Sequence, residues 1–83
     1  MTFFQDFYVY SGAIWVRVEF NEQFHPVKAL GFHRNKEHTE DVQNDHALFH
    51  HDTHRDCYTC HFPHLGNYKF EIFFNGREWV TIM

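Results

Sequence analysis

Alternating apolar and polar residues in positions 3–20 restrict the fold of this chain more than any other sequence feature. Two such runs flank Ser11-Gly12, which is the pattern of a hairpin whose strands each bury one face. A two-residue turn there places Asp6 opposite Arg17, an ion pair suited to the solvent-facing side. The same register gathers on the other side the apolar residues that we expect in the core: Phe3, Phe7, Val9, Ile14, Val16, Val18 and Phe20.

The C-terminal residues 68–82 predict a second hairpin. They form two apolar runs around Asn75-Gly76, and Asn-Gly is the strongest short-range hairpin signal. A two-residue turn pairs Phe74 with Arg77, Ile72 with Trp79 and Phe70 with Thr81. Between the hairpins, residues 27–33 predict a third strand, and Pro26 suits an edge or the first residue of a strand.

Residues 40–51 are the one segment that predicts a helix. Thr39 suits the N-cap position, and carboxylates at Glu40 and Asp41 favour the positive end of a helix dipole. Helical spacing places on one side Val42, His46, Phe49 and His50. Residues 54–67 have neither a helical nor a strand period, so we expect an irregular loop there.

The stretch His46–His64 contains both cysteines and six of the nine histidines. Cys57 and Cys60 have the C-x2-C spacing of a zinc knuckle, in which two thiolates take two corners of a tetrahedron. His50 and His54 lie just before them, so little chain has to be ordered to bring four ligands together. We therefore expect a structural zinc, bound by these four residues, that clamps the irregular loop.

The histidine ligands are left open, because other histidines lie within reach: His33, His38, His46, His61 and His64. Metal-free reduced cysteines with unbound surface histidines, or a redox disulfide, are the competing interpretations of this stretch. A histidine-based pH or metal sensor is a further alternative, because metal ligands have to be deprotonated to bind.

His38 and Glu40 ahead of the C-x2-C pair resemble the zinc deaminases, in which His and two Cys bind zinc and Glu transfers protons. The chain departs from that family at Asp56, where Pro is expected. Residues 41–56 also leave little room for the helix and strand between the two halves of the motif.

Asp45-His46, with a second histidine after the cysteines, is similar to the HNH nucleases, whose general-base His precedes a metal-binding His. The Asn expected between them is missing. The C-x2-C-H sequence that ends at His61 matches covalent haem attachment, which requires export. A small zinc-dependent enzyme of deaminase-like or HNH-like chemistry is therefore the alternative to a non-enzymatic protein, and we assign no catalytic residue.

The length of 83 residues predicts one domain, residues 1–83, of α+β class with a limited core. The net charge of −4 argues against a nucleic-acid partner, because phosphate binding requires a basic stripe. The N-terminal segment lacks the basic start of a signal peptide, and no apolar run approaches the ~20 residues of a membrane span. We therefore expect a cytoplasmic protein with reduced cysteines and no membrane partner.

The solvent-facing side of the first hairpin is unusually aromatic. It contains Tyr8, Tyr10 and Trp15, with Asp6 and Arg17 beside them. Aromatic side chains dominate the hot spots of protein interfaces, so this side is either covered by the chain or binds a partner. We predict a protein-binding module that uses these five residues. It would be an inhibitor or adaptor, similar to the small phage (viral) effectors that act on a larger protein machine.

Overall fold

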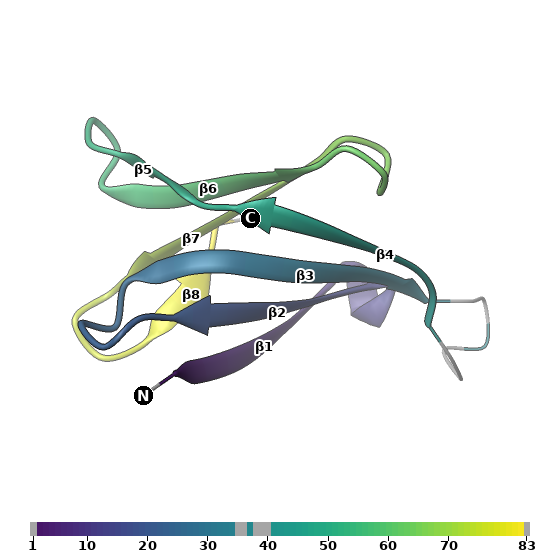
Figure 1. The fold of residues 1–83 in the computed structure, drawn as a ribbon, viewed down its shortest axis with the longest axis horizontal. Coiled ribbons are helices and arrows are strands. Elements are labelled where there is room, and N and C mark those ends of the chain that lie inside the picture. The colour runs from purple at the N-terminus through teal and green to yellow at the C-terminus, as the bar shows by residue number, and fades with distance from the viewer. Residues whose placement is uncertain (1, 35–36, 38–40, 83) are drawn as a thin grey trace.

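Two four-stranded antiparallel sheets make up the fold (Figure 1). The computed structural model describes residues 2–34, 37 and 41–82, and of residues 41–43 only the backbone. The strands are β1 (Phe3–Val9), β2 (Ile14–Phe20), β3 (Pro26–Arg34), β4 (Asp41–Leu48), β5 (His50–Asp52), β6 (Cys57–Phe62), β7 (Tyr68–Phe74) and β8 (Trp79–Thr81). Sheet A has the order β1-β2-β3-β4 and sheet B the order β5-β6-β7-β8. Since the described residues contain no α-helix, the protein is all-β and the predicted α+β class is wrong.

The N-terminal hairpin has the predicted register, with Asp6 opposite Arg17. Its turn is longer than predicted, because a short 3-10 turn, η1 (Tyr10–Gly12), separates the strands. The N–H of Ala13 donates to the carbonyl of Tyr10 at 3.0 Å and closes this turn. The predicted core face is confirmed: Phe7, Val9, Ile14, Val16, Val18 and Phe20 are buried, and Phe3 packs against them.

The predicted third strand is present as β3, with Pro26 as its first residue. Gly31 in this strand lies opposite Val16 of β2. A Cβ atom at Gly31 would lie 3.0 Å from Leu65 Cδ1 and from Phe62 Cε1. Because a close-packed interior does not accept such a distance without a shift, glycine allows sheet B to approach sheet A here.

The predicted helix over residues 40–51 is wrong, because residues 41–51 contain β4 and the first two residues of β5. β4 pairs with β3 along its length. Its inward side chains include the carboxylate of Asp45 as well as Ala47, so the apolar alternation of a strand is interrupted in the sequence. The open edge of β3 supplies backbone hydrogen bonds, and this tertiary context overrides a weak helical preference. The predicted cap at residues 39–40 lies outside the described residues.

The predicted loop over residues 54–67 contains a strand, because β6 lies between β5 and β7 in sheet B. Tyr58, Cys60 and Phe62 of β6 alternate toward sheet A and pack in or against the core. Strand hydrogen bonds on both sides hold this backbone. The zinc-clamped loop of the predicted fold is therefore corrected to a central strand.

The C-terminal hairpin is present, but its register is shifted by two residues from the prediction. Ile72 lies opposite Thr81 and not opposite Trp79. The turn runs from Asn75 to Glu78, and the N–H of Asn75 donates to the carbonyl of Glu78 at 3.0 Å. Because side chains alternate with a period of two, a shift of two residues keeps the predicted core face toward the core.

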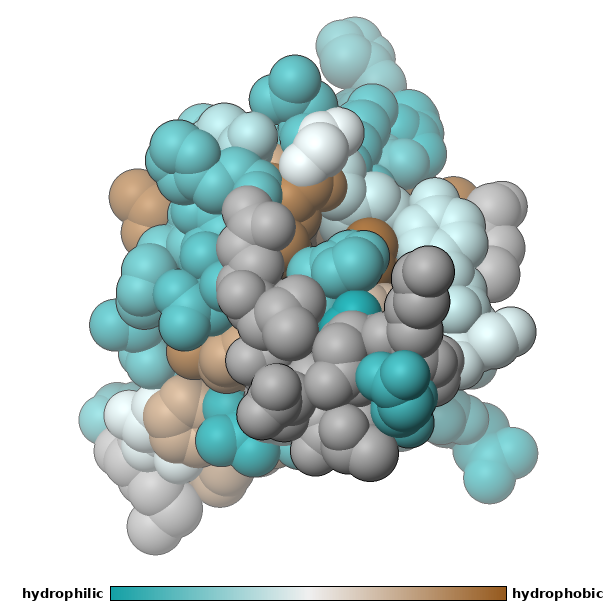
Figure 2. Space-filling view, turned by 90° about the vertical axis from the view of Figure 1, so that its right-hand side faces the viewer, coloured by the Kyte–Doolittle hydropathy of each residue, from teal (hydrophilic) through white to brown (hydrophobic). Residues whose placement is uncertain are grey.

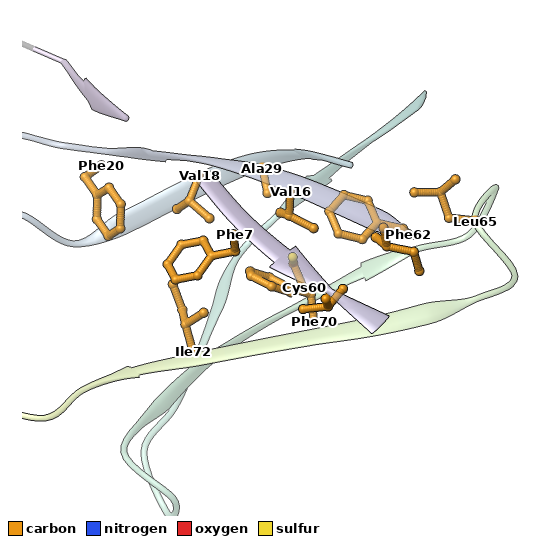
Figure 3. Packing of buried hydrophobic residues seen from close by; sticks show 12 residues of the cluster. Phe7, Val16, Val18, Phe20, Ala29, Cys60, Phe62, Leu65, Phe70 and Ile72 are labelled. Carbon is orange, nitrogen blue, oxygen red and sulfur yellow. The ribbon is translucent and has the colours of Figure 1, made fainter. Parts of the chain in front are cut away.

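The hydrophobic core lies between the two sheets, where the labelled side chains point toward one another (Figure 3). Phe62, Phe70 and Ile72 of sheet B are its largest fully buried side chains. Phe7 of β1 meets Phe70 of β7 edge-on, with the ring centroids 5.5 Å apart. Large apolar rings from both sheets therefore set how the sheets pack.

The two ends of the molecule differ. The β2–β3, β5–β6 and β7–β8 turns lie together at the left-hand end of Figure 1. Figure 2 looks onto the opposite end, where the described surface is mostly hydrophilic and apolar residues form small separate patches. Within the described residues, no helix has the length and apolar character to span a membrane.

Candidate binding surfaces

The outer face of sheet A consists of side chains that point away from the core. Strand pairing places one residue of each strand in every cross-strand row. Three rows make up this surface: Phe4, Glu19, Lys28 and Leu48; Asp6, Arg17, Leu30 and His46; Tyr8, Trp15, Phe32 and Asn44. Tyr8 is 60% exposed and Leu48 is 70% exposed, so the described part of the chain leaves this face open to solvent.

Three aromatic rings stack side by side across the outer face of sheet A. The centroids of Tyr8 and Trp15 are 6.2 Å apart with an interplanar angle of 17°. Those of Trp15 and Phe32 are 4.4 Å apart with an angle of 23°. The strands hold the three rings in a fixed row, so little rotamer freedom is left for a partner to remove.

Two guanidinium groups flank the central ring of this row. The Cζ atom of Arg17 lies 5.3 Å from the Trp15 centroid, and that of Arg34 lies 5.4 Å from Trp15 and 5.6 Å from Tyr8. Arg17 also donates from Nε to Asp6 Oδ1 at 2.8 Å and from Nη2 to Oδ2 at 3.2 Å. The hydrogen bond to Asp6 raises the pKa of Arg17. Both arginines therefore make cation–π contacts with the row, and Arg17 is also held in place by Asp6.

A shallow hollow of about 180 Å³ adjoins the aromatic row. Side chains of the outer face line it, among them Phe4, Leu30 and His46. Lys28 and Glu19 form an ion pair at its edge, with Nζ and Oε1 3.6 Å apart. The face thus combines an aromatic row, in which Tyr8 is exposed and Trp15 and Phe32 are half-buried, with an apolar depression and a mixed-charge edge. This is the composition of a protein interface.

Four of the five predicted partner-binding residues, Asp6, Tyr8, Trp15 and Arg17, lie together on this face. Tyr10 does not, because it lies in η1 and its ring meets Tyr68 edge-on at 5.6 Å. Sequence reasoning missed Phe32, which completes the aromatic row from β3. The alternation of β3 contained this signal, but the sequence did not show which residue of the strand lies opposite Trp15.

The four predicted zinc ligands are not brought together. His50 lies opposite Thr59 in sheet B, and His54 is exposed in the β5–β6 turn. Cys60 packs in the core, whereas Cys57 belongs to the alternate side of β6, where its Sγ lies 4.0 Å from Thr59 Oγ1. Two thiolates on opposite faces of one strand do not reach the same metal ion.

The other candidate histidine ligands are also dispersed. His46 lies on the outer face of sheet A, while His61 and His64 are exposed in β6 and in the turn after it. His33 is at the end of β3, and His38 lies outside the described residues. The described residues contain no group of three or more His, Cys, Asp or Glu that is arranged to bind a metal. The donor set therefore does not fit a zinc site, and zinc binding stays a prediction from the sequence.

Both cysteines are free and fully buried. Burial in the apolar core raises the pKa of the Cys60 thiol to about 12. Nucleophilic or metal-binding cysteines act as thiolates, so Cys60 behaves as a small core residue and not as a reactive group.

A polar cluster occupies the outer face of sheet B. Arg55 Nη1 donates to Glu71 Oε2 at 2.6 Å, and Thr59 Oγ1 donates to the same oxygen at 3.2 Å. The hydrogen bond from Arg55 is the main reason that the pKa of Glu71 is lowered. The charged groups of this cluster are paired with one another. The cluster is therefore better suited to holding the β5–β6 turn on the sheet than to catalysis.

Comparison with known proteins finds no matching family model, no similar curated protein and no similar solved structure.

Proposed function

We propose that this protein is a small non-enzymatic binding module, an inhibitor or adaptor, that contacts a partner protein through the outer face of sheet A. The observation that supports this function is the row of Tyr8, Trp15 and Phe32, stacked across three strands, exposed at Tyr8 and flanked by arginines. Aromatic and arginine side chains are the most enriched hot-spot residues of protein interfaces.

The rigidity of the row favours tight binding. Binding costs free energy when flexible side chains are immobilised, about 0.5–1.5 kcal/mol for each. Here the rings are stacked before a partner arrives, and Arg17 is held by two hydrogen bonds to Asp6. The indole Nε1 of Trp15 is buried and finds no acceptor among the described residues.

The charges of this face favour a protein over a nucleic acid. Arg17 and Lys28 are each paired with a carboxylate of the neighbouring strand, Asp6 and Glu19. A phosphate-binding surface instead presents cations that are free to replace counterions. A mixed and locally neutralised rim suits a protein surface.

The function is tested with Tyr8→Ala, because Tyr8 is an exposed member of the row and its loss leaves the core intact. Tyr10→Ala is the matched control, since Tyr10 is equally exposed but lies off this face. Each tagged protein is used to capture partners from an extract of its native host, and the captured protein is then purified for calorimetry. We expect Tyr8→Ala to weaken binding about tenfold or more and Tyr10→Ala to leave it within about twofold.

Equal binding by both variants would place the interface elsewhere and contradict the proposal. Tight, salt-dependent binding of single-stranded oligonucleotides that Tyr8→Ala abolishes would also contradict it, because stacked aromatic rings can serve as a platform for bases. Circular dichroism of both variants checks that the fold is intact.

A further inference from the structure

A cleft of about 400 Å³ lies where the β2–β3, β5–β6 and β7–β8 turns meet, at the left-hand end of Figure 1. Its lining comes from these turns and the strands beside them: Gln23, Phe24, His25, His51, Asp56, Tyr58, Phe74 and Trp79. Its volume is in the range of small-ligand sites. We call it the end cleft; none of its residues belongs to the outer face of sheet A.

Four aromatic rings line the end cleft, and the three from sheet B are inclined to one another. Tyr58 and Trp79 have centroids 5.6 Å apart and an interplanar angle of 72°. Phe74 and Trp79 are 5.5 Å apart with an angle of 54°. The fourth ring, Phe24, stacks on Phe3, with the ring centroids 4.5 Å apart. Inclined rings form a concave wall, whereas a planar aromatic ligand needs two parallel walls.

The end cleft has one formally charged lining residue, Asp56, when the histidines are counted as neutral. The Asp56 side chain is 93% exposed, and its Oδ1 lies 3.3 Å from His51 Nε2. His51 is in turn fixed by stacking on Tyr58, with the centroids 4.5 Å apart. A carboxylate is thus positioned beside the aromatic wall.

We propose that the end cleft binds a methylated ammonium group. A compact organic cation is attracted to the faces of Trp and Tyr rings, and methylation lowers the cost of removing it from water. The inclined rings suit its rounded shape, and the Asp56 carboxylate complements its charge. The proposal rests on residues separate from the outer face of sheet A, so it stands or falls independently of the proposed function.

The probe is tetramethylammonium chloride, titrated into the protein at pH 8, where free imidazoles are neutral. The Trp79 indole N–H signal in a nitrogen–proton correlation spectrum reports on the end cleft, and the Trp15 signal reports on the opposite sheet. We expect a saturable shift at Trp79 and none at Trp15. tert-Butanol, similar in size but neutral, and sodium chloride at equal ionic strength are the ligand controls.

Asp56→Asn tests the role of the carboxylate. Asn is well tolerated at the positive φ of 51° found at Asp56, so this variant is expected to fold. We expect it to weaken tetramethylammonium binding about threefold, whereas Asp6→Asn, the same charge change on sheet A, leaves binding unchanged. Phe74→Leu removes one exposed ring at similar volume and is expected to weaken binding as well.

Two further probes distinguish the sources of such a group. A peptide with trimethylated lysine represents a protein source, and phosphatidylcholine vesicles represent a lipid source. Binding of either that competes with tetramethylammonium supports the proposal and identifies the source. The proposal is overturned if tert-butanol or sodium chloride shifts Trp79 as strongly as tetramethylammonium does, or if none of the three probes that contain a methylated ammonium group binds.

Discussion

Asp45 is a buried carboxylate that ties the turn after β6 to the edge strand of sheet A. Its Oδ2 accepts the N–H of His64 at 2.7 Å, and its Oδ1 accepts the N–H of His46 at 2.9 Å. Among the described residues, Asp45 is the only charged residue that is buried. Because both oxygens are used, the carboxylate is satisfied and serves as a link between the two sheets.

We expect Asp45→Ala to lower the free energy of unfolding by about 1–3 kcal/mol, because it leaves the N–H of His64 without its acceptor in a partly buried position. Urea denaturation followed by tryptophan fluorescence measures the change. Asp56→Asn, an exposed carboxylate in a turn, is the control and should stay within about 0.5 kcal/mol. Equal stability of Asp45→Ala and the native protein would show that water replaces this link without cost.

We expect Glu71 to make the stability depend on pH. Its pKa is lowered in the folded protein, chiefly by the hydrogen bond from Arg55. A carboxyl group with a lowered folded-state pKa stabilises the protein above its unfolded pKa of about 4.3, and this contribution is lost as the pH falls through the folded-state value. We therefore expect Glu71→Gln to be less stable than the native protein at pH 7.

The stability difference between Glu71→Gln and the native protein should shrink as the pH falls below about 4.3. Thermal unfolding of both proteins between pH 7 and pH 3 measures it. A difference that is constant over this range would mean that the loss comes from packing and not from the ionised carboxylate.

At the scale of elements, β6 decides the chemistry of the two cysteines. Three residues of strand span about 10 Å, beyond the roughly 7 Å between Cα atoms that a disulfide allows. Both thiols are fully buried, and burial raises the pKa of Cys60 to about 12. The two cysteines of the C-x2-C motif therefore occupy buried positions of a strand in this structure, and they do not form the turn of a zinc knuckle.

We expect both thiols to resist a thiol-reactive disulfide reagent at pH 8 in the folded protein, since reaction requires an accessible thiolate. In guanidinium chloride both should react at once, which is the internal control. Mild oxidation of the folded protein should leave two free thiols, as measured by intact mass after alkylation. Rapid formation of a Cys57–Cys60 disulfide under native conditions would contradict the strand assignment of β6.

At the scale of the whole molecule, two sheets close over one core, and the described residues bring together no group of three or more metal ligands. We therefore expect the chelator EDTA to leave the melting temperature unchanged, because the packed apolar core joins the two sheets through side chains that are not metal ligands in this arrangement. Elemental analysis of the purified protein accompanies the melting curves, with zinc added back as the control. A bound zinc together with a large fall in melting temperature after EDTA would show that zinc stabilises the fold, as the sequence predicted.

Where local pattern and tertiary packing agree, the sequence predicted the fold. The register of β1 and β2 was readable because a slip of one residue would have reversed both faces. The register of β7 and β8 was not, because Asn75-Gly76 indicated a turn without showing its length. The candidate surface was partly predicted: the cross-strand pair of Tyr8 and Trp15 was local, whereas its neighbour Phe32 came from another strand.

The sequence by itself determined the two hairpins, the third strand and the apolar face that forms the core, because period-two alternation and turn residues act over short distances. Tertiary structure alone decided the secondary structure of residues 41–62. Their histidines, cysteines and acidic residues hide the alternation, and only the open edges of β3 and β7 convert them into β4, β5 and β6. Backbone hydrogen bonds to distant strands thereby outweighed the local signals of a helix and a metal knuckle.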